Sequence, residues 1–168
     1  MTSGGKAKIS WLMKDLLNTT HRMNSTATSE NGWPATEMRT WLRETILPTI
    51  DSGIRSHIVE VDKSYVNYTT RSTLISTDTI WLPSIREIFG VNDKYYENTG
   101  IIYDTIFSNQ DNIIKELKKM PESYWLRSGI STNTTIAKTS FHAINEEGSL
   151  KNNTATGDLG ICIGFCTN

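Results

Sequence analysis

The stretches that decide the fold are Tyr124-Trp125-Leu126-Arg127-Ser128 and Leu159-Gly160-Ile161-Cys162-Ile163-Gly164-Phe165-Cys166. Short apolar runs, here interrupted by glycine, are more typical of buried strands than of helices. The segment between them is rich in Asn, Thr, Ser and Gly and has no helical period. A long polar segment held at both ends by core strands is usually displayed to a partner. An irregular loop without a ligand is the alternative.

Length and charge narrow the class of protein. The 168 residues suffice for one domain with a real core, and the net charge of −1 argues against a nucleic-acid partner. No apolar run approaches the length of a bilayer span, so we expect no membrane insertion. The opening Met1-Thr2-Ser3-Gly4-Gly5-Lys6 has no hydrophobic signal region. We expect residues 1–8 to be a linker or junction and residues 9–168 to be a single domain, cut from a larger protein.

The ends of the chain are expected to pair with each other. Ile9–Met13 is a short apolar segment, and we predict that it pairs with Ile161–Thr167. Most helical patterns lie in the first two thirds of the chain, at Trp33–Ile46, Ser84–Phe89 and Asp111–Met120. Strands at both ends around a helical middle indicate an α+β fold with a mostly antiparallel sheet.

Sequence signals for chemistry are weak. Cys162 and Cys166 would point to one face of a strand about 13 Å apart, beyond disulfide reach, so we expect buried free thiols. The three histidines lie in separate segments, without a motif that joins them to a nucleophile or a carboxylate. A triad could still assemble in space. We expect no enzyme activity, no catalytic residue, no cofactor and no metal ion.

Four phrases, taken in order, resemble a bacterial and phage domain family of uncharacterised function with a C-type lectin-like fold. These phrases are Gly32-Trp33 with Glu37-Met38-Arg39, Ile80-Trp81-Leu82-Pro83-Ser84 with Glu87-Ile88-Phe89-Gly90, Tyr124-Trp125-Leu126-Arg127-Ser128, and Gly160 to Phe165. The resemblance runs from about Ile9 to the end of the chain. It implies paired terminal strands and side chains projecting from a fixed scaffold.

Proteins of this family resemble the tips of phage tail fibres, prophage proteins and modules of bacterial surface proteins. Some are similar to the variable proteins of diversity-generating retroelements, in which the hypervariable segment follows the Trp-Leu-Arg-Ser phrase. The resemblance therefore implies an adhesin-like location on a virion tail or a cell surface. It also implies a cell-surface protein or glycan as ligand, and possible homo-oligomers. The formylglycine-generating enzymes share the broad fold, but fold alone does not carry activity.

The candidate ligand-binding residues lie in the polar segment. Alternation along a strand would place Lys138, Ser140 and His142 on one face, and a turn at Gly148 would fold the next segment back beside them. The full predicted set is Lys138, Ser140, His142, Asn152, Asn153, Thr154, Thr156 and Asp158, backed by Phe141 and Ile163. Their amide, hydroxyl and carboxylate groups suit glycans or polar protein epitopes. Ordinary solvated strand surface is the alternative interpretation.

Arg127 receives a structural interpretation, because a guanidinium beside a buried Trp-Leu pair can hold several carbonyl groups at the base of the loop. We therefore expect a non-enzymatic ligand- or receptor-binding module. The alternative is a structural subunit of a tail or surface assembly that contacts only its neighbours.

Overall fold

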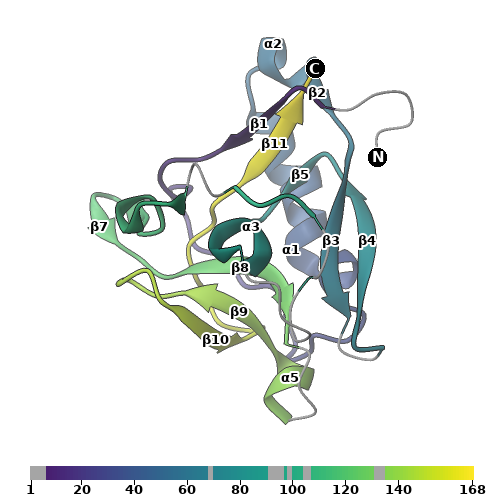
Figure 1. Ribbon diagram of the computed structural model, residues 1–168, viewed down its shortest axis with the longest axis vertical. Coiled ribbons are helices and arrows are strands. Elements are labelled where there is room, and N and C mark those ends of the chain that lie inside the picture. Colours follow the sequence, from purple (N-terminus) through teal and green to yellow (C-terminus); the bar gives the residue numbers. More distant parts are fainter. Residues whose placement is uncertain (1–6, 68–69, 91–96, 98–99, 104–106, 131–134) are drawn as a thin grey trace.

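The computed structural model describes residues 7–67, 70–90, 97, 100–103, 107–130 and 135–168. Within these ranges the chain has an α+β fold with short helices and mostly antiparallel pairing. The described strands form a four-stranded sheet, a three-stranded sheet and two two-stranded hairpins. The fold class is thus confirmed at this coarse level (Figure 1).

The terminal strands pair as the sequence predicts. β1 (Ile9–Leu12) lies antiparallel to β11 (Gly164–Thr167), and the two run side by side in Figure 1. β11 also pairs with β2 (Ile58–Val59) and β5 (Ile80–Trp81). A Cβ atom on Gly164 would lie 2.3 Å from the Trp81 ring, so this crossing requires glycine.

A chain of short helices follows the N-terminal loop. They are η1 (Trp33–Ala35), α1 (Glu37–Trp41), the π-helical η2 (Leu42–Ile46), η3 (Leu47–Thr49) and α2 (Ser52–Arg55). The sequence predicts one continuous helix over Trp33–Ile46, but the helix is interrupted at Thr36, so this prediction is wrong near its start. Thr36 has an extended backbone, and its hydroxyl caps α1 by accepting from the Arg39 N–H. The buried Trp33 instead donates its indole N–H to Asp78 at 3.1 Å.

The middle of the chain forms a hairpin and a capped helix. β3 (Val61–Asn67) pairs with β4 (Ser72–Asp78) along their whole length. α3 (Ile85–Phe89), which falls within the predicted helix, begins with a capping box in which the side chains of Ser84 and Glu87 each accept from the other's backbone N–H. Gly90 ends this helix at a φ of 64°, the left-handed conformation expected there.

The amphipathic helix predicted over Asp111–Met120 is wrong. This segment forms η4 (Gln110–Asn112) and a tight hairpin of β6 (Glu116–Leu117) and β7 (Met120–Pro121). The buried ammonium group of Lys115 donates to the carbonyls of Met13 and Lys14 at 2.9 and 2.8 Å. Tertiary contacts to the N-terminal segment thus override a helical spacing of apolar residues.

The last third is more structured than the sequence indicated. β8 (Tyr124–Gly129) is buried throughout, as predicted, and pairs with β9 (Ser140–Ile144), which pairs in turn with β10 (Leu150–Thr154). A short helix, α5 (Thr135–Thr139), precedes β9, so helices are not confined to the first two thirds. The strand predicted through Ser140 and His142 is therefore confirmed, but Lys138 lies in α5 and not in that strand. Residues 131–134 lie outside the described ranges.

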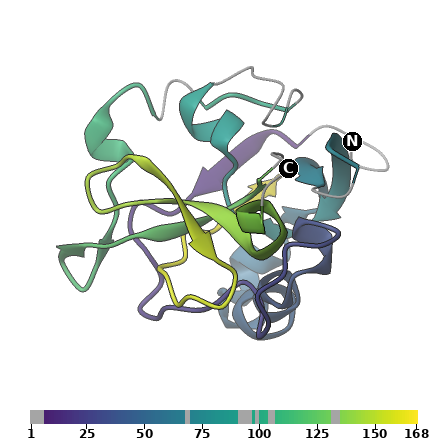
Figure 2. The same cartoon turned by 90° about the horizontal axis from the view of Figure 1, so that it is seen from below.

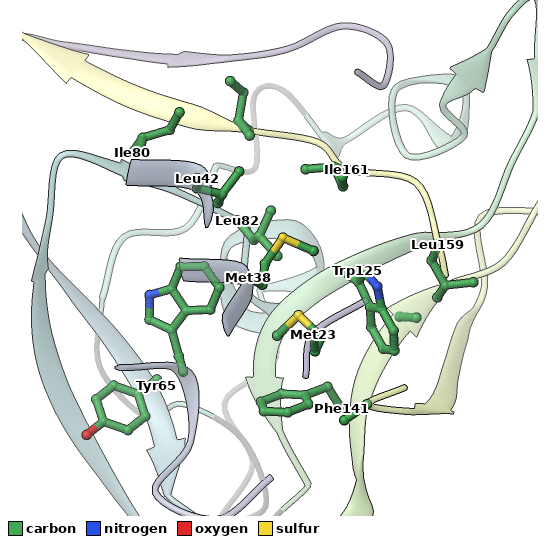
Figure 3. Packing of buried hydrophobic residues seen from close by; sticks show 14 residues of the cluster. Met23, Met38, Leu42, Tyr65, Ile80, Leu82, Trp125, Phe141, Leu159 and Ile161 are labelled. Carbon is green, nitrogen blue, oxygen red and sulfur yellow. The ribbon is translucent and has the colours of Figure 1, made fainter. Parts of the chain in front are cut away.

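The core contains two apolar clusters, and both thiols are buried and free, as expected. One cluster joins the N-terminal loop and α1 to the β8–β9 sheet, and Figure 3 shows Met23, Trp125 and Phe141 close together within it. The other joins β5 and α3 to the opposite face of β8, where Tyr124 and Leu126 lie. Trp81 and Trp125 are both fully buried, which confirms them as core residues.

A buried charge network joins the middle of the chain to β8. The Glu87 carboxylate accepts from Arg127 Nη1 at 2.6 Å and from Lys63 Nζ at 2.9 Å. Arg127 also donates to the carbonyls of Leu82 and Ser64, at 2.6 and 2.9 Å. All three charged side chains are almost completely buried. The structural interpretation of Arg127 is confirmed.

The network predicts a specific response to acid. Burial alone raises the pKa of Glu87, but the charges and hydrogen bonds of Arg127 and Lys63 outweigh it and lower the pKa to about 2. The ionised carboxylate therefore stabilises the fold above pH 4.5, and this contribution is lost as the pH falls from 4.5 through about 2. Urea denaturation should show the free energy of unfolding decreasing over this range.

Glu87→Gln should lower the free energy of unfolding at pH 7 by about 3–5 kcal/mol, because it removes the buried carboxylate that Arg127 and Lys63 share. It should also reduce the loss of stability between pH 4.5 and 2. Glu44→Gln is the matched control, since Glu44 is exposed and pairs with the exposed Arg43. A Glu87→Gln protein as stable as the wild type would refute the role of the network.

Candidate functional site

The hairpin β9–β10 brings most of the predicted binding residues together. Its register places Asn152 opposite His142 and Thr154 opposite Ser140, so these four side chains share one face of the sheet. Gly148, at a φ of 79°, lies in the turn between the strands. The prediction that this turn folds the Asn/Thr segment back beside β9 is confirmed. Figure 2 shows the hairpin toward the viewer.

The predicted exposure of this face is wrong for two residues. Ser140 and His142 are 4% and 6% exposed. β9 is the central strand of its sheet, flanked by β8 and β10, and every one of its residues is buried. Alternation in a sequence shows which side chains share a face, but not whether that face meets solvent.

The remaining predicted residues separate by exposure. Asn152 and Thr154 are exposed on β10, and Thr156 and Asp158 are exposed in the turn that follows it. Asn153 is half-buried and points to the opposite side of the sheet, because it lies opposite Phe141.

Lys138 is exposed but lies in α5, so it does not share the strand face of Ser140 and His142. Phe141 and Ile163 are buried in one cluster behind this region, as predicted. We call the exposed set the hairpin surface. It consists of Lys138, Asn152, Thr154, Thr156 and Asp158.

His142 forms part of the floor beneath the hairpin surface. Burial lowers the pKa of His142 from 6.5 to about 4, although hydrogen bonding to the Asn152 side chain and to the Lys151 backbone acts in the opposite direction. The imidazole is therefore neutral at pH 7. A neutral ring carries one donor and one acceptor, so it can fix the amide of a neighbouring asparagine without adding charge to the surface.

A cleft of about 410 Å³ lies between the N-terminal loop and the helices η1, α1 and η2, and the N-terminal loop also contacts the segment that follows β10. His21 connects the two regions, because its backbone N–H donates to the carbonyl of Leu159 at 3.0 Å. The rings of His21 and Trp41 stack at 4.2 Å between centroids, with an angle of 23° between their planes. The cleft is lined by these rings and by Arg22, Ala35, Thr36, Glu37, Thr40, Glu44 and Thr45.

Sequence reasoning missed this cleft. The helical pattern over Trp33–Ile46 includes Trp41, and the three histidines lie in separate segments without a motif that joins them to other residues. The two aromatic residues lie far apart in the chain, and no local motif joins them. They meet because the N-terminal loop pairs with Leu159 and also packs against α1, where Met38 N–H donates to the Met23 carbonyl at 3.0 Å.

The described residues also bear on metal sites and on membrane spans. Among the described residues, no group of three or more His, Cys, Asp or Glu side chains is placed to hold a metal ion. None of the described helices combines the length and apolar character needed to cross a bilayer.

The burial of His142 gives a direct prediction. NMR titration should show one histidine with a pKa of about 4, and His142→Gln should remove that signal. The pKa of His142 is lower in the folded chain than in the unfolded chain, so between pH 6.5 and 4 the unfolded chain binds more protons at this residue. The free energy of unfolding should therefore decrease as the pH falls through this range. The Gln variant should lack that contribution. A midpoint near 6.5 for the assigned His142 signal would mean that the ring is solvated.

Comparison with known proteins gives a family and no activity. No curated protein sequence and no solved structure matches the chain. The model of one family, described as a domain of unknown function (DUF6273), matches residues 10–166. Since this match covers nearly the whole chain, the protein belongs to the DUF6273 family.

Proposed function

We propose that the chain is a non-enzymatic ligand- or receptor-binding module that uses the hairpin surface. The observation that carries the proposal is the exposure of five polar side chains on a segment whose ends are fixed in the core. β8 precedes this segment and is fully buried, and β11 follows it and is paired with three other strands. A rigid frame with an exposed polar segment is a common design for recognition.

The chemistry of the hairpin surface supports polar ligands. An amide, two hydroxyls, a carboxylate and an ammonium group offer both donors and acceptors, which suits a glycan or a polar protein epitope. Exposed residues of this kind also change at little cost, because surface substitutions usually alter stability by about 0.5 kcal/mol or less. A surface that is diversified to meet new ligands needs that property.

The resemblance to phage and bacterial surface modules supplies the wider context of the proposal. In that context the domain has a C-type lectin-like fold and belongs to a phage tail fibre, a prophage protein or a bacterial surface protein. Its ligand is then a protein or glycan on a cell surface. The pairing of β1 with β11 is consistent with such a fold.

A multiple substitution tests the hairpin surface. The variant replaces Lys138, Asn152, Thr156 and Asp158 with alanine, and binding of labelled protein is measured on a glycan array and on a panel of bacterial cells. The melting temperature should stay close to that of the wild type, because all four residues are exposed, while binding to the wild-type targets should be lost.

The control variant replaces four exposed residues elsewhere with alanine, namely Lys8, Glu60, Ser108 and Lys119. It should bind as the wild type does. If the hairpin variant stays folded and keeps its binding, the ligand site lies on another surface. If it unfolds, these residues belong to the scaffold.

A second candidate function, a structural subunit that binds neighbouring subunits, is favoured by one other surface. Ile9, Trp11 and Ile54 are about half exposed, and Trp11 stacks beside Phe165 with 6.4 Å between ring centroids. A hollow of about 440 Å³ lies between this ring pair and α2, and its lining includes Ile54. Contiguous exposed apolar surface of this kind marks protein contacts.

Sedimentation measurements over a range of protein concentrations test this second function. Wild-type protein should associate as its concentration rises, and Trp11→Ser combined with Ile54→Ser should abolish association, because burial of apolar area drives it. Ile75→Ser is the control, since Ile75 is 64% exposed but lies on β4. Wild-type protein that remains monomeric throughout would exclude self-assembly through this surface.

A further inference from the structure

The cleft around His21 and Trp41 has a rigid apolar base. Trp41 packs against the main apolar cluster, and its stacking on His21 holds both rings in place. The His21 backbone is held as well, since its carbonyl accepts from the indole N–H of Trp125 at 2.8 Å. An aromatic surface that is already ordered loses little conformational entropy when a ligand packs against it.

The rim of the cleft offers donors and acceptors together. Arg22, Thr40 and Thr45 can donate hydrogen bonds, while the carboxylates of Glu37 and Glu44 accept them. A hydroxyl group is both a donor and an acceptor, so a ligand with several hydroxyls can use both kinds of partner. An ammonium ligand would use only the carboxylates, and an anion would use only the donors.

The two carboxylates of the cleft already have partners. Ser25 donates a hydrogen bond to the Glu37 carboxylate, and Arg43 pairs with Glu44 at 3.1 Å. A cationic ligand would have to compete with these contacts, and an anionic ligand would be repelled by the two carboxylates. A neutral ligand with hydroxyl groups can donate hydrogen bonds to the same carboxylates without displacing a counter-ion.

From these features we infer that the cleft binds a neutral saccharide, with the C–H face of a pyranose ring against the His21–Trp41 stack. The hydroxyls of the sugar bond to Glu37, Glu44 and the donors of the rim. The volume of about 410 Å³ lies within the range of about 300–1,000 Å³ that is usual for small-ligand sites. This site lies outside the hairpin surface and does not rest on the function proposed for it.

The test uses defined small molecules and NMR. Methyl pyranosides of glucose, galactose, mannose and N-acetylglucosamine are titrated into the protein while the signals of the Trp41 indole and the His21 ring are followed. Tetramethylammonium chloride and sodium sulfate are titrated in parallel as the cationic and anionic alternatives. At least one pyranoside should shift both signals and show saturation transfer to its ring protons.

A matched pair of variants locates the site. Glu44→Ala and Arg43→Ala both break the same surface ion pair, but only Glu44 lines the cleft. Glu44→Ala should weaken pyranoside binding about tenfold or more, as expected for the loss of a hydrogen bond to a charged group. Arg43→Ala should change it by less than about twofold. Both residues are exposed, so both variants should fold.

Several outcomes would overturn the inference. These are the absence of shifts with every pyranoside, shifts at Trp41 and His21 with tetramethylammonium or sulfate instead, or equal effects of the two variants. The alanine variant of Lys138, Asn152, Thr156 and Asp158 separates the two proposals, because it should keep pyranoside binding in the cleft. The hairpin variant should thus lose binding to cells or glycans while the cleft still binds pyranosides. Glu44→Ala should weaken pyranoside binding while the hairpin surface still binds its ligand.

Discussion

The Glu87 carboxylate, held between Arg127 and Lys63, is the contact on which the rest of the fold depends. Lys63 lies in β3, Glu87 in α3 and Arg127 in β8, so one carboxylate joins three elements that are distant in the chain. Removing three charges from water is costly, and their mutual attraction compensates only when the geometry is good. An alternative packing of these elements would leave at least one buried charge unpaired.

This requirement makes the network a device for specifying the arrangement of the fold. Apolar contacts alone tolerate shifts between elements, because burial of apolar area is not directional. The guanidinium of Arg127 forms hydrogen bonds in fixed directions. Its bonds to the Leu82 and Ser64 carbonyls therefore hold β8 in one position. The strand β9 and the hairpin surface are thereby fixed relative to the core.

The two candidate binding regions share this frame but differ in character. The hairpin surface has exposed polar groups that contribute little to stability, so its side chains can vary while the fold is retained. The cleft instead uses Trp41, which also packs against the core, and His21, which is paired with Leu159. Its aromatic residues are therefore less free to change. A variable surface beside a more constrained cleft would allow one domain to combine a changing contact with a constant one.

The exposed apolar face of the β1–β11 pair results from the way in which the two strands pair. Pairing of the chain ends buries Cys166 but leaves Trp11 half exposed, since successive side chains of a strand point to opposite faces. Trp11 is fixed by a hydrogen bond from its indole N–H to Thr167 and stacks beside Phe165. An ordered aromatic residue at the surface is a feature of contact sites, where little entropy is lost on binding.

The sequence by itself determined the features that depend on neighbouring residues or on apolar runs. The capping box of Ser84 and Glu87, the left-handed Gly90, the buried β8 and the pairing of the terminal strands all follow from such patterns. It also predicted that the segment after Gly148 folds back beside the strand that carries Ser140 and His142, as the β9–β10 pairing shows.

Only the tertiary structure decided which strand faces are exposed to solvent. The burial of Ser140 and His142 depends on the neighbours of β9, and a strand's alternation carries no information about them. The hairpin in place of a helix at Glu116–Pro121 depends on Lys115 reaching the Met13 and Lys14 carbonyls. The cleft depends on His21 meeting Trp41 through a loop that pairs with Leu159. Contacts between distant segments have no local signature, which is why a single sequence does not reveal them.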